Sequence, residues 1–108
     1  MSNDLNQCQF IGRLGKDVEI RYAPDGAEVA TFSLACGWKT SSKEGTEWVR
    51  VTAFGKLASI CGTYLKKGKQ VFIQGRMQTR EYEKDGSKRY VTEIIADQMQ
   101  MLGSKESQ

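Results

Sequence analysis

The middle of the chain reads Thr46-Glu47-Trp48-Val49-Arg50-Val51-Thr52-Ala53-Phe54, and the alternation of these residues predicts a strand with two unlike faces. From Val49 onward, one face carries the small aliphatic side chains of Val49, Val51 and Ala53. The other carries Trp48, Arg50, Thr52 and Phe54. Packing gives no reason for two large aromatics and an arginine to share the second face, unless a flat and negatively charged ligand lies on it. Single-stranded nucleic acid has both properties, because its bases stack on aromatic rings and its phosphates attract cationic side chains.

One helix is predicted directly after this strand. From Lys56 to Lys67 apolar residues recur at helical spacing, Lys66 and Lys67 fall in the last turn, and Gly68 can close the helix in a left-handed conformation. The cluster of Lys66, Lys67 and Lys69 is therefore explained as helix-end capping rather than as a phosphate site. We expect this helix to pack one face on the sheet.

Further strands are predicted on both sides of this central pair. Strand patterns before it occupy residues 6–14, 19–22 and 29–36, and a polar loop follows at residues 39–45. After the helix, residues 70–82 and 89–96 alternate on either side of Asp85-Gly86, which is a strong hairpin signal. This order predicts an all-β fold, a five-stranded OB-fold barrel of antiparallel strands with one inserted α-helix that closes one end. An SH3-like barrel has less room for that helix.

Composition limits the possible functions. The chain has 108 residues, of which 39% are hydrophobic, and this suits one domain with one core. No histidine is present, which removes the usual proton shuttle and the commonest metal ligand, so catalysis and a metal site are poor hypotheses. The three cysteines, at positions 8, 36 and 61, lie within apolar patterns and are expected to be buried, reduced thiols. A formal charge of +3 is too small to indicate nucleic acid by itself.

No targeting or membrane segment is visible in the sequence. The apolar runs are only a few residues long, and the first five residues contain Asp4 instead of a basic start. We therefore expect a cytoplasmic, nucleoid-associated protein with no membrane partner.

Six blocks of this chain resemble, in the same order, the bacterial single-stranded DNA-binding protein family. They are Gly12-Arg13-Leu14-Gly15-Lys16-Asp17, Arg21-Tyr22, Thr46-Glu47-Trp48, Phe54-Gly55-Lys56-Leu57-Ala58, Tyr64-Leu65-Lys66-Lys67-Gly68 and Met99-Gln100-Met101-Leu102-Gly103. The resemblance covers nearly all of residues 5–103. It implies an OB-fold, a homotetramer with a dimer as the alternative, and sequence-tolerant wrapping of single-stranded DNA during replication, recombination and repair. It implies neither catalytic activity nor a cofactor.

The resemblance also implies a set of binding residues. In the family, bases stack on aromatics at positions that match Trp38, Trp48, Phe54 and Tyr82 of this chain. From the strand faces, the best phosphate ligands are Arg50, Arg76 and Arg80, followed by the loop residues Lys39, Lys43, Lys84 and Lys88. The other rings are expected in the core or in a subunit interface: Phe10, Tyr22, Phe32, Tyr64, Phe72 and Tyr90.

This chain departs from the family pattern at several places. Residues 1–103 form the expected DNA-binding domain, but residues 104–108 are a short remnant without the family's long linker and acidic tip, so no recruitment of replication or repair enzymes through the C-terminus is expected. Val49 replaces a histidine found at the subunit contact of enterobacterial members, and Tyr82 replaces a frequent tryptophan. Two other functions stay open: a replication-restart primosome accessory OB protein acting mainly through protein partners, and a purely structural oligomer.

Overall fold

The computed structural model describes residues 3–103, so the predicted remnant at residues 104–108 lies outside the described residues. Its elements follow one another as β1 (Cys8–Leu14), β2 (Glu19–Tyr22), β3 (Glu28–Lys39), β4 (Glu44–Phe54), α1 (Gly55–Tyr64), β5 (Gln70–Lys84) and β6 (Ser87–Met101). The sheet runs in the order β1-β5-β6-β4-β3-β2, and an additional pairing between β1 and β3 closes five of the strands into a barrel. The predicted OB-fold with a single helix is confirmed.

The barrel closes where β1 crosses β3. Arg13 pairs with Ala35 and Leu14 with Leu34, and a side chain on Gly12 would lie 2.5 Å from the carbonyl oxygen of Ala35. Only glycine permits this close approach of the two backbones. One pairing differs from the prediction of an antiparallel sheet, because β4 and β6 run parallel over Val51–Thr52 and Ile94–Ile95. The two strands are joined through α1 and β5, so the chain has the length that a parallel connection requires.

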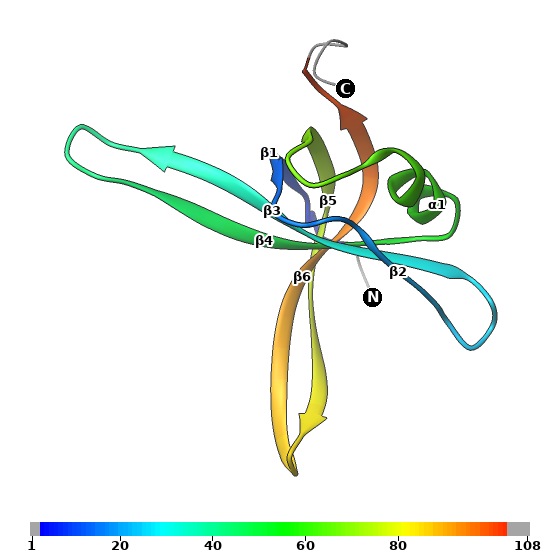
Figure 1. Ribbon diagram of the computed structural model, residues 1–108. Helices are drawn as coiled ribbons and strands as arrows, with labels where there is room; N and C mark the ends of the chain where they lie inside the picture. Colours follow the sequence, from blue (N-terminus) through cyan, green and yellow to red (C-terminus); the bar gives the residue numbers. More distant parts are fainter. Residues whose placement is uncertain (1–2, 104–108) are drawn as a thin grey trace.

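Two long hairpins extend beyond the barrel (Figure 1). We call them the β3–β4 arm, which ends in the turn at residues 40–43, and the β5–β6 arm, which ends at Asp85-Gly86. Both arms are longer than the sequence pattern suggested, since β3 continues to Lys39, β5 continues to Lys84 and β6 begins at Ser87. Neither face of a projecting hairpin is buried, so the ends of the arms are polar. The apolar alternation that predicts a strand is therefore absent there.

The core fills the barrel and the end that α1 covers. Its buried residues are Leu14, Ala30, Phe32, Leu34, Val51, Ala53, Ala58, Cys61, Leu65, Val71, Ile73, Ile94 and Ala96. Helix α1 packs on β3 and β4 and contributes Ala58 and Cys61 to this core. Three of the rings that we expected in the core or in a subunit interface, Tyr22, Tyr64 and Tyr90, are exposed in the single chain. Phe32 is buried, and Phe10 and Phe72 are half-buried.

The end of the helix differs from the prediction. α1 ends at Tyr64, and Leu65 is already extended, with its N–H donating to the carbonyl of Cys61. Burial of Leu65 in the core pulls the chain out of the helix, and residues 66–69 then form a turn in which the Gly68 N–H donates to the carbonyl of Leu14. Lys66 and Lys67 therefore lie after the helix, and the explanation of their charges as helix-end capping is wrong.

The thiols are only partly as predicted. All three cysteines are free, but only Cys61 is buried, while Cys8 and Cys36 are half-buried. Burial raises the pKa of the Cys61 thiol to about 11. The pKa of Cys36 is also raised, first by desolvation and then by the neighbouring carboxylate of Glu47, its partner on β4. Both thiols therefore stay protonated and unreactive at neutral pH.

Candidate nucleic-acid interface

One exposed face spans three neighbouring strands in the order β5, β6 and β4. The pleat of β4 brings Trp48, Arg50, Thr52 and Phe54 to this face, opposite the buried Val51 and Ala53. The register of β5 against β6 brings a second row to the same face: Arg76, Gln78, Arg80 and Tyr82. We call this surface the outer face; it holds six of the nine predicted site residues, which come from two separate stretches of sequence.

Trp48 lies against the turn that follows β1. Its side chain is 59% exposed, and a side chain added at Gly15 would meet its ring carbon Cζ3 at 2.4 Å. Lys16 and Ser33 complete a shallow depression beside the ring. The Gly15 backbone therefore supports the indole ring, and a cation stands next to it, which is an arrangement suited to a base and its phosphate.

Trp38 lies on the opposite side of the β3–β4 arm from Trp48. The two residues occupy alternate faces of the hairpin, because Trp38 pairs with Gly45 while Trp48 pairs with Ala35. Trp38 is 46% exposed, and its ring covers Gly45 so closely that a side chain there would approach Cζ2 to 2.7 Å. Each tryptophan ring thus lies on a glycine: Trp38 on Gly45, its partner across the strand pair, and Trp48 on Gly15 in the turn after β1.

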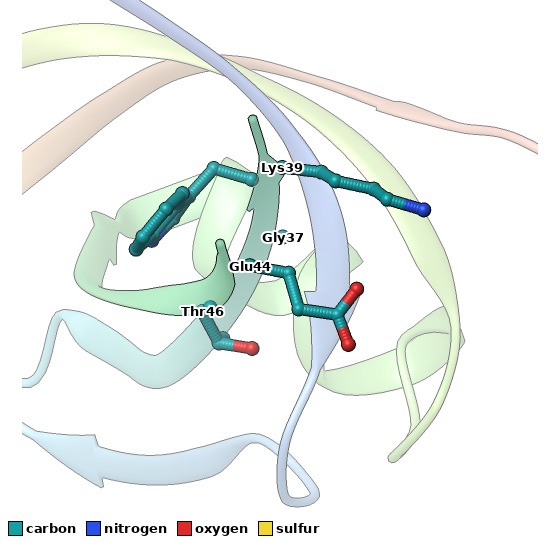
Figure 2. Close-up of a pocket in the computed structure, with 6 residues that line it drawn as sticks. Gly37, Lys39, Glu44 and Thr46 are labelled. Atoms are coloured by element: carbon teal, nitrogen blue, oxygen red, sulfur yellow. The ribbon is translucent and has the colours of Figure 1, made fainter. Parts of the chain in front are cut away.

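The end of the β3–β4 arm carries a mixed set of charges. Figure 2 shows Lys39, Glu44 and Thr46 extending to one side of the arm, around a depression that Trp38 also lines. Lys43 lies in the turn, where the hydroxyl of Thr40 accepts hydrogen bonds from the backbone N–H groups of Ser42 and Lys43. Lys39 belongs to β3 rather than to the predicted loop.

Phe54 and Tyr82 occupy the two ends of the outer face. Phe54 is the last residue of β4, and its side chain is 51% exposed. Tyr82 is 39% exposed and pairs with Arg89 near the end of the β5–β6 arm. Of the hairpin lysines, Lys88 lies 3.7 Å from a carboxylate oxygen of Glu81, and both side chains are largely exposed. Such a pair contributes little to stability.

A buried carboxylate lies between the arginines of the outer face. Glu93, on β6, is 4% exposed and accepts a hydrogen bond from the hydroxyl of Thr52 at 2.8 Å. The Nε of Arg80 donates to its other oxygen at 3.0 Å, and the Nε of Arg50 lies 3.6 Å from the first. Arg76 is separate and donates to the side-chain oxygen of Gln78.

Sequence reasoning missed Glu93, Gly15 and Gly45. Glu93 belongs to an alternating strand, and nothing local distinguishes it from a solvated glutamate, since its partners come from β4 and β5. The role of Gly15 depends on a ring 33 positions later in the chain, which no local pattern indicates. Gly45 alone carried a usable signal, because a glycine opposite an aromatic in a hairpin often supports the ring.

Two negative findings apply to residues 3–103. Within this part of the chain, no helix is long and apolar enough to cross a membrane. The same residues contain no group of three or more acidic or cysteine side chains that could hold a metal ion.

Known proteins resemble this chain in sequence and in fold. The model of the single-strand binding protein family matches residues 5–102. Single-stranded DNA-binding protein 1 of Chlorobaculum tepidum is 51% identical over 114 residues, which cover 99% of this chain and 70% of the relative. The protein of the same name from Xylella fastidiosa is 48% identical, with 94% of this chain and 80% of the relative covered. A solved Plasmodium falciparum SSB complex with ssDNA aligns with a TM-score of 0.85 at 31% identity, covering 95% of this chain and 99% of that chain.

Proposed function

This chain belongs to the single-strand binding protein family, and from this membership and the outer face we propose that it binds single-stranded DNA without sequence preference. Members of this family are binding proteins and not enzymes. Bases stack on Trp38, Trp48, Phe54 and Tyr82, while Arg50, Arg76, Arg80, Lys39 and Lys43 contact phosphates. This activity protects exposed single strands during replication, recombination and repair.

The observation that carries the proposal is the alternation of exposed rings and guanidinium groups on one face. Trp48, Phe54 and Tyr82 are all exposed there, and Arg50 and Arg80 lie between them. Every base has a stacking face, so rings that offer roughly 1–3 kcal/mol per base bind any sequence.

The positions of the two tryptophans support wrapping rather than a straight path. Because Trp38 and Trp48 lie on opposite sides of the β3–β4 arm, one strand that contacts both must bend around the arm. Single-stranded DNA has the flexibility for this bend, whereas a duplex of such short length is stiff. The arm therefore favours single strands over double strands by shape as well as by stacking.

The test is a titration with a labelled thymine oligonucleotide, followed by anisotropy and by quenching of the intrinsic tryptophan fluorescence. We expect quenching in the wild-type protein, and a loss of roughly 1–3 kcal/mol of binding free energy in each of W38A and W48A. A matched pair tests the outer face: Y82A weakens binding, while Y90A does not, since Tyr90 is exposed on the other face of the same arm.

Circular dichroism of each variant shows whether the fold is intact. Unchanged affinity in both folded tryptophan variants contradicts the stacking assignment. No binding by the wild-type protein contradicts the proposed function itself.

A further inference from the structure

Glu93 is the only acidic side chain among the described residues that is buried, and it is surrounded by groups of the outer face. Burying a carboxylate is costly unless it is paired and hydrogen-bonded. Here both oxygens have partners from neighbouring strands, Thr52 and Arg50 on β4 and Arg80 on β5. The carboxylate is thus fixed in position and shielded from any ligand.

The way in which the arginines contact Glu93 leaves their outer ends available. Both use Nε toward the carboxylate. Among residues 3–103, no protein group accepts a hydrogen bond from the terminal nitrogens of Arg50 or Arg80, and both side chains stay more than 40% exposed. Terminal guanidinium nitrogens form the fork that binds phosphate through two parallel hydrogen bonds.

We propose that Glu93 is a positioning residue for DNA: it holds Arg50 and Arg80 by their inner edges and presents their terminal nitrogens, already ordered, to the phosphates of the bound strand. The inference rests on the proposed function and adds to it a residue that does not touch the ligand. Without such an anchor, each long side chain has to be immobilised when the strand binds, which reduces affinity.

Simple electrostatics predicts the opposite effect of removing Glu93. Loss of a negative charge below the phosphate site would increase the attraction for DNA. The terminal nitrogens lie at the surface, however, where water and salt screen this gain. The conformational entropy lost when two disordered arginines are immobilised is not reduced by such screening. We therefore expect the positioning effect to exceed the charge effect, so that a variant with more positive charge binds DNA more weakly.

The experiment compares E93Q with E83Q in oligonucleotide binding at several salt concentrations. Glu83 is an exposed carboxylate on the same arm, so E83Q removes the same charge without affecting an arginine. We expect E93Q to bind about threefold to tenfold more weakly, the factor for losing the ordering of one such side chain. We also expect its plot of log affinity against log salt to be shallower by about 0.7 for each phosphate that an arginine no longer neutralises. E83Q should match the wild-type protein in both.

Each outcome decides the proposal. If folded E93Q binds as tightly as the wild-type protein or more tightly, or if its salt slope is steeper or unchanged, the proposal is wrong. If E93Q does not fold, T52V replaces it, since this variant removes only the hydroxyl that orients the carboxylate. Weaker binding by T52V then supports the proposal. Unchanged binding by T52V overturns it. Failure of the wild-type protein to bind would instead refute the proposed function.

Discussion

At the scale of single residues, the two tryptophans are held by the glycines beneath them. Trp48 lies on Gly15 and Trp38 on Gly45, and in both cases a methyl group on the glycine would overlap the ring. An exposed indole on a strand would otherwise move among several rotamers, and ordering it on DNA binding would cost free energy. The glycine contacts therefore order the rings before DNA binds. Each contact covers one face of the ring and leaves the other face for a base.

We predict that G15A weakens DNA binding without unfolding the protein. The added methyl group would lie 2.4 Å from the ring, and the ring is a side chain that can move aside, so Trp48 is displaced rather than the backbone. The loss of binding free energy should approach, but not exceed, the roughly 1–3 kcal/mol of one stacked base. Anisotropy with the thymine oligonucleotide measures it.

The matched control for G15A is G37A. Gly37 is a strand glycine that precedes Trp38 in the sequence, but the atom nearest to its added methyl group is 4.0 Å away, so G37A should bind like the wild-type protein. Equal affinities of G15A and G37A, with unchanged tryptophan emission in both, would show that the contact with Gly15 does not position the ring.

At the scale of elements, the sequence predicted the strands and the helix but not where they end. The apolar spacing of residues 56–65 identified α1, and the lysines after it suggested a longer helix, because helix-end cations and turn cations have the same sequence pattern. Burial of Leu65 decided the end, and burial depends on the barrel. In the same way, alternation placed Trp48, Arg50 and Phe54 on one face, whereas the partners of Glu93 lie 13 and 41 positions away and could not be read locally.

The turn of the β5–β6 arm leads to a prediction for this element. Asp85 and Gly86 have φ values of 54° and 76°, the left-handed pair that a two-residue hairpin turn requires. G86A should therefore cost about 1 kcal/mol locally and loosen the arm end, where Tyr82 lies. We expect faster hydrogen exchange at residues 80–90 and weaker DNA binding, with little change in the exchange of the barrel.

D85N is the control for G86A, because asparagine adopts the left-handed conformation readily and keeps the turn. Its exchange rates and affinity should equal those of the wild-type protein. If G86A and D85N show the same hydrogen exchange at residues 80–90 and the same DNA affinity, the arm end does not depend on this turn.

At the scale of the whole molecule, the arms make the chain less compact than a barrel alone. The radius of gyration is 15.3 Å, whereas a compact domain of this length would have about 13 Å. The extra surface belongs to the two hairpins that project from the barrel (Figure 1). A ligand or a second copy of the chain would cover this surface, and the proposed DNA path uses both sides of the β3–β4 arm and the Tyr82 side of the β5–β6 arm.

The edge of β1 predicts self-association. Within residues 3–103, residues 8–12 of this strand pair with β5 on one side only, since β3 contacts β1 only at Arg13 and Leu14. Ile11 on this uncovered edge is 57% exposed, and a strand edge that is apolar and poor in charge pairs readily with a copy of itself across a two-fold axis. We expect at least a dimer, and a tetramer if a second contact forms near Val49, as the family resemblance implies.

Sedimentation equilibrium at micromolar concentration should show this assembly in the wild-type protein. I11K should shift the assembly toward monomer, because a lysine on the edge opposes strand pairing. S42K adds the same charge in the distant turn of the β3–β4 arm and should leave the assembly intact. A monomeric wild-type protein would refute edge pairing, and DNA wrapping would then have to be completed by the two arms of a single chain.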